Sequence, residues 1–341
     1  MWKSLGSSTI YNRISIDMSW DRCGLRSTSS AAKLNLNTAS SVSVTNFANS
    51  ADEIIRIIAP GSKLPGLSPT DLKLLRQKQK RLANNASSTL DVLPGGTYIR
   101  NALEATLIFA QYEAGTAVCI NRAGWVLTCA HCFGDTEKEY QESDKRKWLL
   151  FYNGLAVQTE CRDWDGKRDL ALLKIIAIES RQVKAGESPL IASVPISEAS
   201  PSYKMPILCI GQPGRDDLES TLDRRTKYNL VEVSEGKFRG MVRDADPQDN
   251  SEIGTLMHDA WTYWGHSGAP LIRESDGTLI GLHSSWDDKT AMRHGIPQVA
   301  IKDFLQRVLL SRKLTNEPAD ESSAQVGGLD HGTATFPIVI D

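Results

Sequence analysis

Three side chains, far apart along the chain, have the types needed to activate a serine. Ser267 lies in the stretch GHSG, His131 follows the apolar segment WVLTCA, and Asp169 directly precedes the apolar segment LALLKII. A serine hydroxyl is a weak nucleophile at neutral pH, so it needs a base to remove its proton and a third group to fix the tautomer of that base. Histidine and a carboxylate supply these two roles. The three residues therefore predict an acyl-transfer site.

The glycine two residues before this serine suits the charge that such a reaction develops. Attack on a carbonyl leaves an oxyanion, which needs hydrogen-bond donors already in place. Gly265 can turn its backbone N–H in the same direction as the N–H of Ser267. The nucleophile and its stabilising donors would thus come from one short turn.

Other interpretations of these residues remain open at this point. Asp163 and Asp165 compete with Asp169 as orienting carboxylates, although both lie in a turn-like run, whereas Asp169 abuts a predicted strand. Taken alone, GHSG is more often a turn than an active site. The run CAHC also predicts an alternative, a zinc protein built on Cys129, His131 and Cys132, but a CxxC without a second pair is a weak signal.

The residues that carry these side chains belong to a β-rich region. After residue 95 the chain contains short apolar or β-branched segments bounded by Gly, Pro, Asn, Asp or Ser: ATLIFA, TAVCIN, WVLTCA, KWLLFY, LALLKII, PILCIG and TLIGLHSS. Many short strands with turn residues between them indicate a sandwich or barrel of the all-β class. Helical spacing of apolar residues over 299–310 predicts a terminal helix.

Three parts are expected along the chain. Residues 1–95 form an N-terminal extension that is partly disordered and has one helix near 69–83, capped by the run SPTD. Residues 96–312 form the folded domain, and 313–341 form a flexible tail. The basic run 76–81 is interpreted as the solvated face of the helix, with a localisation signal or an acidic partner as the less favoured readings.

Bulk composition excludes several classes of function. The chain has 341 residues and a formal net charge of -2, so nothing in it indicates nucleic-acid binding. It has no apolar run long enough to span a membrane and no secretory signal segment. Its six cysteines are too irregular for a disulfide scaffold, and an intracellular, cytoplasmic or nuclear location is expected, with organelle targeting left open.

Five stretches, in order, resemble the trypsin-like (chymotrypsin-fold) serine proteases, and among these the HtrA/DegP-like branch. They are GTAVCINRAGWVLTCAH, LCIGQPG, DAWTYWGHSGAPLI, GTLIGLHSS and GIPQVAI. The resemblance covers about residues 98 to 310. The tail that follows is too short for the PDZ domain found in many members of that branch.

The resemblance implies a fold and a set of roles. The fold would be two six-stranded antiparallel β-barrels, with the crossover near 178–205. His131 would be the general base, Asp169 its orienter and Ser267 the nucleophile, and the N–H groups of Gly265 and Ser267 would form the oxyanion hole. The substrate pocket would contain Trp261 at its base and Ser284, Ser285 and Trp286 along its wall.

The expected activity is that of a serine endopeptidase acting on protein or peptide substrates. No cofactor and no metal are expected, and self-association stays open. His266 stands where secreted trypsins carry the aspartate that pairs with a new N-terminus, so activation by such cleavage is not expected. The alternative is a catalytically silent module that binds extended peptides by strand addition.

Overall fold

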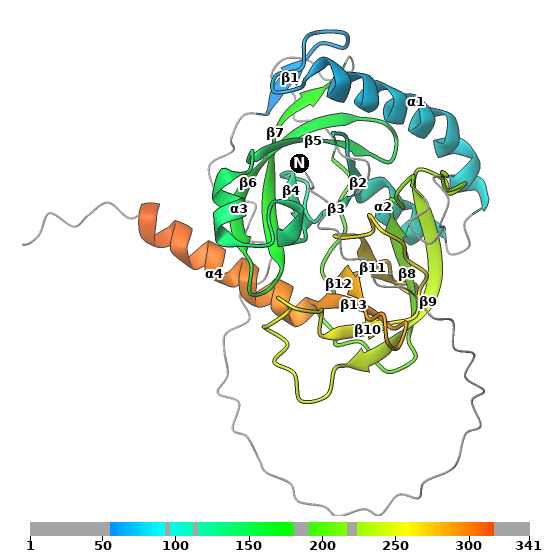
Figure 1. The fold of residues 1–341 in the computed structure, drawn as a ribbon, viewed down its shortest axis with the longest axis vertical. Coiled ribbons are helices and arrows are strands. Elements are labelled where there is room, and N and C mark those ends of the chain that lie inside the picture. Colours follow the sequence, from blue (N-terminus) through cyan, green and yellow to red (C-terminus); the bar gives the residue numbers. More distant parts are fainter. Residues whose placement is uncertain (1–54, 93–95, 112–114, 181–190, 217–223, 317–341) are drawn as a thin grey trace, which may run out of the picture. The chain divides into compact units, whose positions relative to one another are not determined.

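The computed structural model describes residues 55–92, 96–111, 115–180, 191–216 and 224–316 (Figure 1). The expected disorder of residues 1–54 and of the tail from 317 lies outside the described residues. The described part consists mainly of β-strands, with helices at both of its ends.

Six strands of the first half close into a barrel. They pair in the order β7-β4-β3-β2-β5-β6, and β6 returns to pair with β7. Every pairing in the ring is antiparallel. The strands are β2 (Thr106–Phe109), β3 (Thr116–Cys119), β4 (Trp125–Thr128), β5 (Arg146–Phe151), β6 (Ala156–Asp165) and β7 (Leu170–Glu179).

The second half forms another closed barrel, with strand order β10-β13-β12-β11-β8-β9. The last strand of the first barrel ends at Glu179 and the first strand of the second begins at Pro206. The expected crossover near 178–205 stays a prediction. The strands are β8 (Pro206–Gly211), β9 (Glu232–Met241), β10 (Leu256–His258), β11 (Pro270–Arg273), β12 (Leu279–Trp286) and β13 (Arg293–Pro297).

The N-terminal extension contributes structure to the first barrel. Strand β1 (Arg56–Ile58), which the sequence did not predict, pairs in parallel with β7. Helix α1 (Pro69–Val92) starts where expected and is longer than predicted. Its start is fixed by a reciprocal cap, because Ser68 Oγ accepts from the N–H of Asp71 at 3.1 Å and the Asp71 carboxylate accepts from the N–H of Ser68 at 3.3 Å.

Three further helices and one short turn of helix complete the described part. Helices α2 (Gly96–Ala105) and α3 (Glu137–Glu142) were not predicted. The six polar residues of α3 are too few to show a helical period, whereas Ile99, Ala102 and Leu103 of α2 do have helical spacing and are buried, a signal that was missed. The predicted terminal helix is α4 (Gln298–Asn316). A 3-10 turn, η2 (Ala130–Cys132), follows β4. None of the helices in these ranges is long and apolar enough to cross a membrane.

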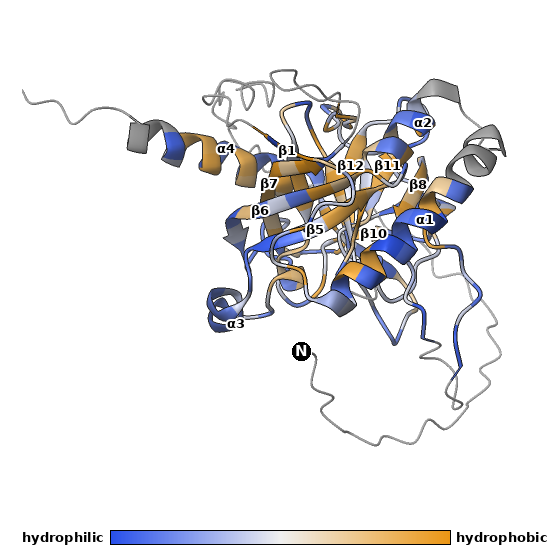
Figure 2. Cartoon of the chain, turned by 90° about the horizontal axis from the view of Figure 1, so that it is seen from above, coloured by the Kyte–Doolittle hydropathy of each residue, from blue (hydrophilic) through white to orange (hydrophobic). Residues whose placement is uncertain are grey.

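The prediction of two six-stranded antiparallel barrels with a C-terminal helix is confirmed. Each of the seven predicted strand segments overlaps a strand of the structure. Apolar residues concentrate in strands β7, β11 and β12, whereas α3 is hydrophilic (Figure 2). The domain limits at residues 95 and 312 stay predictions, although β1 and α1 pack with the first barrel.

Helix α1 is expected to be part of the folding unit. Leu75 is 0% exposed and belongs to the same core cluster as residues of both barrels. Leu75→Ala should lower the free energy of unfolding by about 2 to 5 kcal/mol in urea denaturation, because it leaves a cavity in a packed core. Lys73→Ala, at an exposed position of the same helix, is the control. Equal stabilities of the two variants would show that α1 folds apart from the barrels.

Candidate active site

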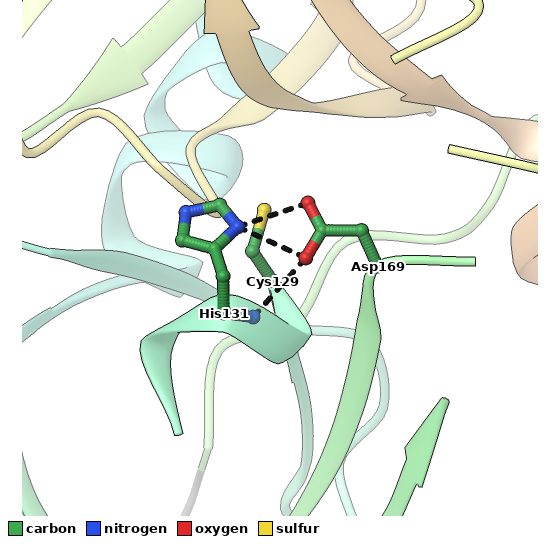
Figure 3. A group of neighbouring side chains, drawn as sticks. All are labelled: Cys129, His131 and Asp169. Carbon is green, nitrogen blue, oxygen red and sulfur yellow. Dashed lines mark hydrogen bonds and ion pairs between the residues drawn. The ribbon is translucent and has the colours of Figure 1, made fainter. Parts of the chain in front are cut away.

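The first barrel brings Asp169 and His131 into direct contact (Figure 3). Asp169 stands immediately before β7 and His131 lies in the η2 turn after β4; these two strands are paired. His131 Nδ1 lies 2.9 Å and 3.0 Å from the two carboxylate oxygens of Asp169. The N–H of His131 also donates to this carboxylate at 3.1 Å. The backbone and ring of one histidine are thus held by one carboxylate.

Backbone geometry helps to aim this carboxylate. Asp169 has φ 53°, in the left-handed region that aspartate tolerates better than most residues. Its own carbonyl accepts from the N–H of Ala130 at 3.1 Å, so the two turns are joined through the main chain as well.

The second barrel supplies another partner of Asp169. Ser284 Oγ, on β12, donates to the carboxylate at 2.7 Å. The sequence placed Ser284 only on the wall of a substrate pocket, and its role as a partner of Asp169 was missed, because nothing local to HSSW indicates which strand faces it. With this bond the 6% exposed carboxylate is bound from both barrels.

The pairing sets the protonation of His131. Burial alone would lower the pKa of His131, but the charge of Asp169 and its hydrogen bond outweigh burial, so the pKa lies above its ordinary value. The side chain of His131 is still 26% exposed. The imidazole is therefore both accessible and made more basic by Asp169.

Ser267 reaches the same cluster through Ser284. Its hydroxyl donates to the carbonyl oxygen of Ser284 at 3.5 Å, while the Ser284 hydroxyl contacts Asp169. In the described part of the chain no hydrogen bond joins Ser267 to His131. Such bonds are often long before substrate binds.

The loop that carries Ser267 is held by Thr116 of the first barrel. The N–H of Thr116 donates to the carbonyl of Ser267 at 3.0 Å, and its hydroxyl donates to the carbonyl of Gly265 at 3.1 Å. Sequence reasoning missed Thr116, which gives no local signal beyond being the first residue of a strand. Its two hydrogen bonds fix the position of the Ser267 turn relative to the first barrel, which carries His131.

The two amides expected to form an oxyanion hole have no acceptor among the described residues. The N–H groups of Gly265 and Ser267 donate to no atom of those ranges. Gly265 has φ 98°, and the carbonyl of Trp264 before it accepts from the N–H of Gly214 at 2.5 Å. In a trans peptide the N–H points away from the carbonyl. The contact with Gly214 therefore turns the N–H of Gly265 away from the Gly214 loop.

His266, beside the serine, has a structural contact. Its side chain is 0% exposed, and Nδ1 lies 3.0 Å from the carbonyl of Tyr263. Burial lowers the pKa of His266 to about 4, more than the bond to Tyr263 raises it. The ring is neutral near pH 7 and supports the turn through its bond to Tyr263.

The expected pocket residues occupy different environments. Trp261 packs against Tyr228, with ring centroids 4.8 Å apart, and its carbonyl accepts from Ser234 Oγ at 2.6 Å. Trp286 and Trp264 are exposed, at 48% and 57%. Ser285 has a buried hydroxyl oxygen without a partner in the described residues. The assignment of Trp261, Ser284, Ser285 and Trp286 to a substrate pocket stays a prediction.

The competing carboxylates are engaged elsewhere. Asp163 pairs with Arg312 at 3.1 Å, and Asp165 pairs with Arg168 at 2.8 Å. Neither contacts His131, whereas Asp169 does.

The side chains that could bind zinc differ from the set expected from the sequence. Within the described ranges, the group whose ligand atoms lie within 4.8 Å of one another is Cys129, His131 and Asp169, without Cys132 (Figure 3). Burial raises the pKa of Cys132 to about 12 and that of Cys129 well above its ordinary value.

Comparison with known proteins gives the class of this chain. Residues 115–282 match the family model of the trypsin-like peptidase domain, a range that contains His131, Asp169 and Ser267. Residues 115–282 therefore carry a trypsin-like peptidase domain.

A solved structure is similar over a comparable range. It is that of the serine endoprotease from Yersinia pestis, with 20% sequence identity, a TM-score of 0.45, and 63% of this chain aligned to 66% of that chain. The chain thus spans just under two thirds of the length of that protein.

Gly268 is expected to be indispensable for the serine turn. It has φ +82°, and a Cβ there would lie 2.2 Å from the carbonyl oxygen of Thr116. Gly268→Ala should therefore displace the turn and cost clearly more than the roughly 1 to 2 kcal/mol that left-handed backbone alone imposes on alanine. Thermal or urea unfolding measures the difference.

The matched control for this substitution is Gly240→Ala. Gly240 also has a positive φ, +101°, but a Cβ there meets no atom within 4 Å. Gly240→Ala should lose only the stability that left-handed backbone costs an alanine. Equal losses of stability in the two variants would show that a Cβ at residue 268 is not crowded by Thr116.

Proposed function

We propose that this chain is a serine endopeptidase that hydrolyses peptide bonds through an acyl-enzyme formed on Ser267. The observation that supports this most is the contact of His131 with the buried carboxylate of Asp169, which is bonded from both barrels. A carboxylate fixed in this way holds Nδ1 protonated and leaves Nε2 free to accept a proton.

The reaction would proceed in two halves. His131 takes the proton of Ser267 as its oxygen attacks the substrate carbonyl, and the resulting oxyanion is bound by the N–H groups of Gly265 and Ser267. His131 then gives the proton to the leaving amine. In the second half, water attacks the acyl group with His131 again acting as the base.

The substrate is proposed to be an extended peptide, lying along the end of β12 with its side chain toward Trp261. The backbone of residues 284–286 would pair with it as an added strand. Aromatic neighbours of Trp261 favour apolar or aromatic substrate side chains. Assignment to the HtrA/DegP-like branch and the intracellular location stay predictions.

A fluorophosphonate probe is expected to label the wild-type protein on Ser267, since it reacts only with an activated serine. Ser267→Ala should lose the label, whereas Ser251→Ala, at an exposed loop position, should retain it. Labelling is measured by gel fluorescence and by mass spectrometry of the modified peptide. Folded wild-type protein that takes up no label would favour the silent, peptide-binding alternative.

The pH profile is expected to report the pairing of His131 with Asp169. Activity needs neutral His131, so it is lost as the pH falls through the pKa of this residue, which the charge of Asp169 holds above its ordinary value of 6.5. The acid limb of kcat/KM should therefore have its midpoint above 6.5.

Asp169→Asn should move this acid limb to lower pH and reduce kcat by about four orders of magnitude, because the charge and the correct tautomer are lost together. The pH dependence of peptide hydrolysis by both proteins measures the shift. An acid limb in the same place for both would mean that Asp169 does not govern the protonation of His131.

A further inference from the structure

Two adjoining cavities lie between α1 and the loop that follows β8, away from the residues assigned to catalysis. Their volumes are about 340 Å³ and 150 Å³. Both are lined by Arg81 of α1 and by Arg215 and Leu230 of the loop, so they form one continuous feature. We call it the α1 cleft. The larger cavity alone is near the lower end of the range of about 300 to 1,000 Å³ typical of ligand sites.

The described residues that line the α1 cleft carry charge of one sign. Lys80 and Arg81 approach it from α1, and Arg215 and Arg225 from the loop. Among the residues that the structure describes, neither cavity has an aspartate or glutamate in its lining. This concentration of positive charge stands out in a chain whose net charge is -2. It attracts anionic groups and repels basic ones.

The floor of the cleft is apolar. Leu74 of α1 and Leu230 of the loop line the larger cavity, and Leu230 is only 3% exposed. A phosphate or another small anion would make no use of these side chains. A peptide that combines carboxylates with a large aliphatic side chain matches both the basic rim and the apolar floor.

The loop that lines the cleft also contacts the Ser267 turn at two places. Gly214, in the smaller cavity, donates its N–H to the carbonyl of Trp264, next to the proposed oxyanion amide of Gly265. Tyr228, in the same lining, packs against Tyr263 with ring centroids 5.5 Å apart. The carbonyl of Tyr263 is bonded to the ring of His266.

We propose that the α1 cleft binds acidic peptide segments that carry a leucine-like side chain, and that this binding stabilises the oxyanion turn. Filling the cleft restrains Gly214 and Tyr228, whose contacts hold Trp264 and Tyr263. The basic run of α1 thus takes part in a binding site in addition to forming a solvated face. Binding itself goes beyond the peptidase activity and does not depend on it.

The binding experiment uses the full chain carrying Ser267→Ala, so that no peptide is cleaved. The probe is a fluorescein-labelled peptide in which glutamates alternate with leucines, and fluorescence anisotropy measures its affinity. Saturable binding that weakens with added salt is expected. Arg81→Glu and Arg225→Glu should each weaken binding by about fivefold or more, since each replaces an attraction by a repulsion. Both side chains are exposed, so the variants are expected to fold.

Controls separate this site from general charge attraction. Arg122→Glu, at an exposed turn that does not line the cleft, should bind like the parent. Probe peptides with glutamine in place of glutamate, or with serine in place of leucine, should bind more weakly. A single-stranded oligonucleotide should not displace the labelled peptide from the α1 cleft. No saturable binding, or equal effects of Arg122→Glu and Arg81→Glu, would overturn the proposal.

The chain's own acidic stretch, residues 217–223, is the other candidate occupant. It is tested with Asp217→Asn, Glu219→Gln and Asp223→Asn combined. Similar affinities with and without these changes support a separate peptide as the ligand. Binding that appears only in the neutralised variant would assign the cleft to the chain itself and overturn the proposal.

The coupling between the α1 cleft and Ser267 is measured on the wild-type protein as the rate of fluorophosphonate labelling. A saturating amount of the acidic peptide should raise this rate by about fivefold, and Arg225→Glu should abolish the increase without changing the rate in its absence. An unchanged rate with peptide bound would overturn the coupling but leave the binding site. A protein that binds the peptide and is never labelled would contradict the peptidase proposal alone.

Discussion

The buried carboxylate of Asp169 is the group on which the rest of the site depends. A carboxylate that is 6% exposed must have its oxygens satisfied by donors, and the donors come from both barrels: the ring and N–H of His131 from the first and the hydroxyl of Ser284 from the second. The same hydrogen bonds that make its burial tolerable also orient the imidazole and raise its pKa. The barrels are therefore tied together at the point where the chemistry is proposed.

The Ser267 turn is fixed by a second set of contacts between the barrels. Thr116 holds the carbonyls of Gly265 and Ser267, and Gly268 is a glycine because a Cβ would collide with the same threonine. These bonds occupy the carbonyls of the turn and leave the amides of Gly265 and Ser267 without acceptors in the described residues. Two amides without such an acceptor are what the proposed stabilisation of an oxyanion requires.

The sequence predicted seven of the strands because apolar segments ended by turn residues are a local signal, whereas β6, β9, β10, β11 and β13 had no such segment. The three residues proposed for catalysis were selected by the same local signal, as Asp, His and Ser near such segments. Contacts between distant segments could not be predicted in this way. Ser284, Thr116 and Gly214 act through partners more than 45 residues away, and strand β1 was missed because three residues carry too little pattern. The basic run of α1 was read as a solvated face, since the loop that faces it is remote in sequence.

The central claim is that Ser267, and not a neighbouring thiol, forms the covalent intermediate. Cys129 and Cys132 flank His131, so an acyl-transfer site with a sulfur nucleophile is the closest chemical competitor. The direct test is to mix the protein with an activated ester, quench in acid, and locate the acyl group by peptide mass spectrometry. The acyl group is expected on the peptide that contains Ser267. An acyl group on the peptide that contains Cys129 and Cys132, or none on folded protein, would contradict the account.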